Sequence, residues 1–135
     1  MDAICTAALA KSQEQEANFR ALVAELPDDA LNWRPGPETN SLAVLVAHTW
    51  GSAQEHTARA SGREIKRDRD AEFRVVLNEE ECIALLDAAC SRVAQFVAAI
   101  APTTYGESHV DQDGNSYTVA DSLIHALEHT QEHRG

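Results

Sequence analysis

The chain has 135 residues, of which 44 % are hydrophobic, a length and composition that suit one globular domain with a single core. Its formal net charge of −11 argues against a nucleic-acid-binding protein, because phosphate contacts need a basic surface. No apolar run approaches the roughly 20 residues of a membrane span, and the amino terminus lacks the basic region of a signal peptide. We therefore expect a single domain over residues 1–135 that binds neither nucleic acid nor membranes.

Two further features of composition concern charge and thiols. Basic and acidic residues alternate between positions 63 and 74, which predicts a solvated connection rather than a binding patch. The three cysteines are Cys5, Cys82 and Cys90, and the last two would lie about 12 Å apart on one helix, too far for a disulfide. An odd number of thiols without a pairing partner predicts a reducing, cytoplasmic location.

The first half of the chain predicts two long helices. The first runs from about Asp2 to Leu26 and ends before Pro27, because a proline disfavours helical backbone in the residue before it. A connection over residues 27–40 follows and carries three of the four prolines. The second helix begins near Ser41, with Asn40 or Ser41 as its N-cap, and continues to about residue 60.

The second half predicts two more helices. Asn78, followed by three glutamates, caps a helix whose apolar residues alternate every three and four positions until Pro102. Residues 103–117 are polar and contain the turn sequence Asp113-Gly114-Asn115, which is compatible with a short hairpin. The last helix begins near Thr118 and runs to the chain end. Four amphipathic helices predict an all-α, antiparallel four-helix bundle.

The last predicted helix carries a histidine at every fourth position: His125, His129 and His133. Residues four apart on a helix share one face, so two adjacent imidazoles can bind one cation at about 2.0–2.1 Å. His125 and His133 are about 12 Å apart along the axis and cannot share an ion comfortably. The spacing therefore predicts a metal-binding pair but does not choose between His125/His129 and His129/His133.

A third imidazole is offered by His48, which follows four apolar residues and lies two positions before Trp50. A buried imidazole needs a proton partner or a metal, so His48 is the natural third ligand. Three neutral nitrogens suit borderline cations such as zinc or nickel. Glu55, seven positions after His48 and on about the same face, is the candidate to orient a ligand imidazole or act as a general base. His56 and His109 lack a partner at a useful spacing and are predicted to lie on the surface.

These residues resemble a known family. The segment from Leu31 to Pro37, then Asn40-Ser41 and His48, is similar to the entry to the second helix in the DinB/YfiT-like superfamily of metalloenzymes. The closing sequence from His129 to Gly135 is similar to that family's last helix. The resemblance covers essentially the whole chain.

The resemblance implies a four-helix bundle with a divalent metal held by His48, His129 and His133, leaving His125 as a neighbour one turn away. It also implies a low-molecular-weight thiol as co-reactant, a small-molecule substrate and a homodimer. The leading hypothesis is thus a thiol-dependent transferase or isomerase. The alternatives are a metal-hydroxide hydrolase with Glu55 as its base, a non-catalytic bundle that binds a metal or small ligand, and a metal-free structural bundle.

Overall fold

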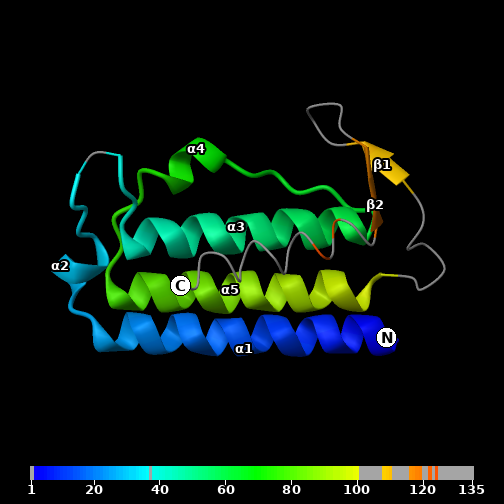
Figure 1. The fold of residues 1–135 in the computed structure, drawn as a ribbon, viewed down its shortest axis with the longest axis horizontal. Coiled ribbons are helices and arrows are strands. Elements are labelled where there is room, and N and C mark those ends of the chain that lie inside the picture. The colour runs from blue at the N-terminus through cyan, green and yellow to red at the C-terminus, as the bar shows by residue number, and fades with distance from the viewer. Residues whose placement is uncertain are drawn as a thin grey trace.

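The computed structural model describes residues 2–36, 38–100, 108–110, 116–119, 122 and 124. Three long helices lie side by side in this part of the chain (Figure 1): α1 (Ala3–Glu25), α3 (Leu42–Ala60) and α5 (Glu79–Ala98). Helix α1 runs antiparallel to the other two, which point in the same direction. Val119, Ser122 and Ile124 are helical, at the start of the predicted last helix. The predicted all-α, helical-bundle class is confirmed.

Each long helix begins at a side chain that accepts a hydrogen bond from its first turn. The Asp2 carboxylate accepts from the Cys5 amide, and the Ser41 hydroxyl accepts from the Val44 amide. Asn78 and Glu81 form a reciprocal capping box, in which each side chain accepts from the other residue's backbone N–H. The caps explain why the helix starts agree with the sequence prediction, since a cap is a local interaction.

Shorter elements occupy the connections. There are two one-turn helices in the described connections, α2 (Asp28–Leu31) and α4 (Arg69–Glu72), and neither was predicted from the sequence. Strand β1 (Ser108–Val110) pairs antiparallel with β2 (Ser116–Thr118), with His109 opposite Tyr117. The predicted hairpin is therefore confirmed.

The core lies between the long helices and centres on Trp50, which is fully buried. The Phe19 ring meets the Trp50 ring edge to face, with centroids 5.9 Å apart, and so joins α1 to α3. Helix α5 contributes Leu86, Val93 and Val97 from its apolar stripe. No helix in the described part of the chain is long and apolar enough to cross a membrane.

The shared direction of α3 and α5 determines the path of residues 61–78. Helix α3 has 19 residues and is therefore about 28 Å long, and the chain must return over this length before α5 can begin. In Figure 1 the connection follows the outer side of α3, with α4 partway along it. Side chains of the connection are thereby brought onto the helix that carries His48.

Asn32 fastens the far end of this connection. Its side-chain amide donates to the Leu77 carbonyl at 2.7 Å, and its side-chain oxygen accepts from the Leu77 amide at 2.9 Å. We predict that Asn32→Ala lowers the free energy of unfolding by about 1–3 kcal/mol, because both backbone groups of Leu77 lose their partner. Urea denaturation measures this change. Asn40→Ala, at an exposed position, is the control, and equal values for the two variants would contradict the prediction.

Candidate functional site

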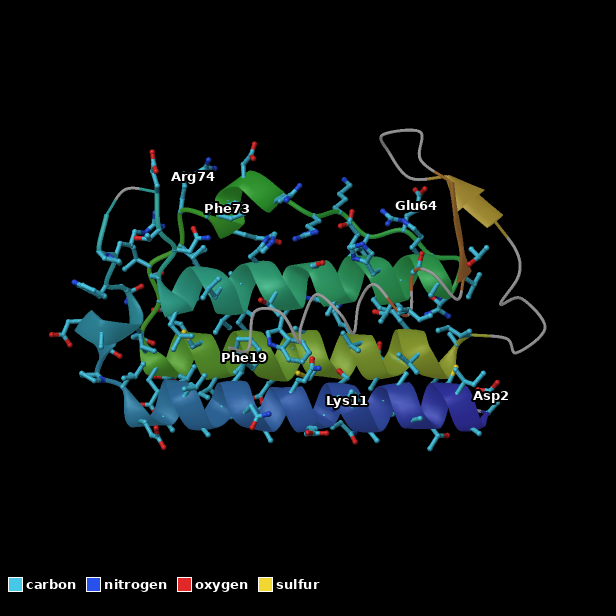
Figure 2. All side chains as sticks on the ribbon, in the orientation of Figure 1. Asp2, Lys11, Phe19, Glu64, Phe73 and Arg74 are labelled. Carbon is cyan, nitrogen blue, oxygen red and sulfur yellow. The ribbon has the colours of Figure 1, made fainter. Side chains whose placement is uncertain are left out.

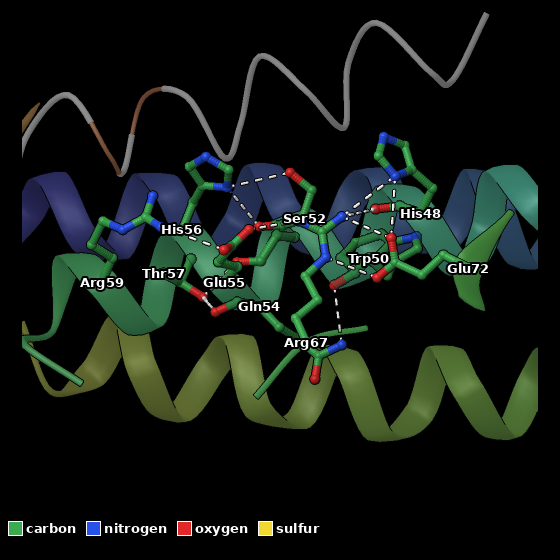
Figure 3. Close-up of polar contacts among 11 residues, drawn as sticks. His48, Trp50, Ser52, Gln54, Glu55, His56, Thr57, Arg59, Arg67 and Glu72 are labelled. Carbon is green, nitrogen blue, oxygen red and sulfur yellow. Dashed lines mark hydrogen bonds and ion pairs between the residues drawn. The ribbon is translucent and has the colours of Figure 1, made fainter. Parts of the chain in front are cut away.

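His48 lies in the middle of α3 with its imidazole buried. Its Nδ1 is 3.2 Å from Oε1 of Glu72 (Figure 3). Its ring lies against that of Phe73, with centroids 4.8 Å apart. Glu72 is the last residue of α4 and Phe73 follows it (Figure 2), so both residues that contact the imidazole come from the connection over residues 61–78. Nη2 of Arg67 also lies 3.4 Å from Nδ1, but this guanidinium nitrogen already donates to Glu72 at 2.8 Å. Because the Glu72 oxygen is the nearer partner and a carboxylate only accepts hydrogen bonds, we assign the proton to Nδ1. The lone pair then lies on Nε2, the atom that would coordinate a metal.

Arg67 holds the Glu72 carboxylate in place. Its Nε donates to Oε2 of Glu72 and its Nη2 to Oε1, both at 2.8 Å, which is the two-pronged geometry of a strong guanidinium–carboxylate pair. Its Nη1 donates to Oε2 of Glu55 at 2.6 Å, and Figure 3 shows the guanidinium between the two carboxylates. Burial opposes the charge on Arg67, but the hydrogen bonds to Glu72 and Glu55 outweigh it, and the pKa of Arg67 is raised.

The local sequence explains why Arg67 and Glu72 face the same way. The Asp68 carboxylate accepts from the Ala71 amide at 3.0 Å and caps α4, which turns the chain between the two residues. Arg67 Nη2 also lies 3.4 Å from the His48 carbonyl oxygen, so the guanidinium contacts the backbone of α3 as well.

The prediction that residues 63–74 form a solvated connection is wrong at Arg67 and Glu72. Their side chains are only 11 % and 12 % exposed. Within this alternation of charges, Arg67 and Glu72 are largely buried and pair with each other. The direction of α5, which forces the connection to return along α3, was not visible in the sequence.

Glu55 lies on the same helix as His48, but its carboxylate is directed toward arginines. One oxygen accepts from Arg67, and the other lies 3.4 Å from Nη2 of Arg59. The carboxylate on the His48 imidazole is that of Glu72, which the sequence analysis did not single out. The suggested catalytic role of Glu55 stays a prediction.

The remaining histidines fall into two groups. His56 is half-buried and its Nδ1 lies 2.8 Å from the Ser52 carbonyl oxygen, so it is less exposed than its predicted surface position implies. His125, His129 and His133 lie outside the described residues, as does the side chain of His109. Among the residues that the structure describes, no three histidine, cysteine or carboxylate side chains are grouped as a metal would require.

The surroundings of His48 fit those of a metal ligand. Histidines that bind metals usually donate their other ring N–H to a carboxylate or carbonyl, which fixes the tautomer and makes the coordinating nitrogen more basic. Glu72 supplies this acceptor. The positive charge of the neighbouring Arg67 is offset by Glu72 and Glu55, so the guanidinium does not leave uncompensated positive charge beside the ring.

The three thiols of the chain are poor nucleophiles. Cys5 and Cys82 are buried, and burial raises the pKa of Cys82, as does the nearby Glu81. Burial also raises the pKa of Cys90 far above its ordinary value, with a further contribution from Glu16. Since the thiolate is the reactive form, the raised pKa values make Cys82 and Cys90 weak nucleophiles at neutral pH.

Comparisons with known proteins identify the family and the fold. A family model described as the DinB superfamily matches residues 12–135. A search of the curated proteins found no match.

Solved structures with the same fold include a conserved protein from Enterococcus faecalis, with a TM-score of 0.81 and 13 % identity over 100 % of this chain and 93 % of that one. They also include the mycothiol-dependent maleylpyruvate isomerase and a histidine-to-alanine mutant of it, each with a TM-score of 0.72 and 11 % identity. The match covers 96 % of this chain but only 59 % of the isomerase. At these identities the likeness shows the fold alone.

We predict that Arg67→Ala lowers the free energy of unfolding by about 3 kcal/mol, because it leaves the Glu72 and Glu55 carboxylates largely buried without their partner. Chemical denaturation of the two proteins measures the difference. Arg69→Ala is the matched control, since Arg69 is exposed in the adjoining helix α4 and should change stability by less than about 0.5 kcal/mol. A loss at Arg67 no greater than that at Arg69 would show that the pair is not formed.

We also predict that the native thiols react with an aromatic disulfide reagent at least about tenfold more slowly than an exposed cysteine, because each unit by which pKa is raised lowers the thiolate fraction about tenfold. Ala84→Cys supplies that exposed reference on α5. The rate is read from the absorbance of the released thiol at neutral pH. Rapid labelling of Cys90 in the folded wild type would refute this assignment.

Proposed function

Because the chain belongs to the DinB superfamily, we propose that it is a divalent-metal-dependent enzyme that joins a low-molecular-weight thiol to an electrophilic small molecule, as a transferase or an isomerase. The observation that carries the proposal is the buried His48 imidazole, whose Nδ1 is bound to the Glu72 carboxylate. His48 would hold the metal together with His129 and His133. Zinc or nickel suits such a set of neutral nitrogens.

The residues around His48 have distinct tasks in this proposal. Glu72 accepts a hydrogen bond from the Nδ1–H of His48, and the lone pair of the ring therefore stays on Nε2. Arg67 holds Glu72 through two hydrogen bonds, and Phe73 limits the tilt of the ring. A divalent metal at the site, when bound, supplies the positive charge that favours the thiolate form of a coordinated thiol.

Two observations support an external thiol as the nucleophile. Cys82 and Cys90 have raised pKa values and Cys5 is fully buried, so the chain offers no reactive thiolate of its own. One solved structure of the same fold is described as a mycothiol-dependent isomerase. The hydrolase alternative is less favoured, because both oxygens of Glu55, its suggested base, face arginine side chains.

The proposal predicts that zinc or nickel stabilises the folded protein. A ligand that binds only the native state adds about 2.7 kcal/mol at a hundredfold excess over its Kd. Untagged protein is stripped with a chelator and its Tm is measured with and without added metal. His48→Ala should abolish the rise in Tm, whereas His56→Ala, one histidine further along α3, should retain it.

Thiol dependence is tested on the same preparations. The protein is loaded with cobalt, and mycothiol, glutathione or cysteine is added while the visible and near-ultraviolet spectra are recorded. A thiolate-to-cobalt absorption band in the wild type and not in His48→Ala is the expected result. Metal binding without any thiol response would remove the thiol from the proposal, and no effect of metal on Tm would overturn the metal centre itself.

A further inference from the structure

Gly51 lies in the interior of α3, three residues after His48. Glycine at such a position weakens a helix relative to alanine, because it has more backbone freedom to lose on folding. The position therefore calls for a structural reason. The structure supplies one in what lies directly over its α-carbon.

The space that a side chain would occupy at Gly51 is filled by the connection. A β-carbon built there would overlap Oε2 of Glu72, with the carboxyl carbon of Glu72 at 2.9 Å and Nε of Arg67 at 3.2 Å. The two contacts with Glu72 are closer than a real β-carbon makes, and the contact with Arg67 is tight. The paired carboxylate and guanidinium thus lie directly against the backbone of α3, beside the imidazole that Glu72 holds.

We propose that Gly51 is a positioning residue, and that residues 61–78 act as a strap whose Arg67–Glu72 pair is seated on Gly51 to fix the tautomer and orientation of His48. The expected consequence, tighter metal binding, rests on the proposed function. Gly51 contributes to the site by having no side chain, which leaves room for the Glu72 carboxylate.

The geometry predicts what a methyl group at Gly51 would change. The atoms in its way are at the end of the Glu72 side chain, which can rotate, so the helix and the core remain intact. The carboxylate, however, must leave its place, and its 3.2 Å contact with His48 Nδ1 is lost. Gly51→Ala should therefore fold, keep its helix content and lose the orientation of one imidazole.

The test compares Gly51→Ala with Gly36→Ala, since a β-carbon at Gly36 meets nothing within 4 Å. The first readout is the ring nitrogen-15 chemical shifts of His48 in the metal-free protein, at mildly alkaline pH where imidazole is neutral. Wild type and Gly36→Ala should show the Nδ1–H tautomer, and Gly51→Ala a mixture of both tautomers. The second readout is the Kd for zinc by chelator competition, which should rise 10–100-fold in Gly51→Ala alone.

Further variants test whether Gly51 acts through Glu72. Glu72→Ala should raise the Kd as Gly51→Ala does, and the double variant should be no weaker than Glu72→Ala. Glu72→Gln keeps an acceptor oxygen and should restore much of the Nδ1–H tautomer.

Three outcomes decide the inference. An unchanged tautomer and an unchanged Kd in Gly51→Ala would overturn it. Additive losses in the double variant would show that Gly51 does not act through Glu72. If the wild type binds no zinc, the proposed function fails, whereas a tautomer change in Gly51→Ala would still establish the strap.

Discussion

The interaction on which the candidate site depends is the ion pair of Arg67 with Glu72 and Glu55. Removing charged groups from water is costly, and a buried pair recovers that cost only with good geometry and additional hydrogen bonds. Arg67 provides both, because three of its nitrogens donate to two carboxylates. The pair does more than stabilise the fold, since it places one carboxylate oxygen at the ring of His48.

The direction of the helices explains why such a pair can form. Helices α3 and α5 point the same way, so the connection between them must return along α3. The return path brings Phe73 and Glu72 against the His48 imidazole, and Gly51 lets the connection approach the helix closely. The arrangement of the backbone and the polarity of the site thus have a common origin.

Much of the fold could be predicted from the sequence, because its signals are local. The caps at Ser41 and Asn78 act within one turn and appear where expected, and the first helix begins next to Asp2 as predicted. The burial of His48 also followed from its apolar neighbours.

The partner of His48 could not be predicted in the same way. Glu72 is 24 residues away, and its position depends on the direction of α5 and the path of the connection. Glu55 lies on the same helix as His48, as predicted, but helical spacing did not reveal that Arg67 would pair with its carboxylate. Gly51, a glycine inside a helix, was a local sign that another segment lies close to the backbone of α3. The roles of His129 and His133 stay predictions.

A double-mutant cycle on Arg67 and Glu72 tests the central claim most directly. The free energies of unfolding of wild type, Arg67→Ala, Glu72→Ala and the double variant give the coupling between the two side chains. A formed, buried pair predicts a coupling of about 1–3 kcal/mol, with the double variant less destabilised than the sum of the single ones. Losses that add to within about 0.5 kcal/mol would show that the two side chains do not interact, and the account of the His48 site would then be contradicted.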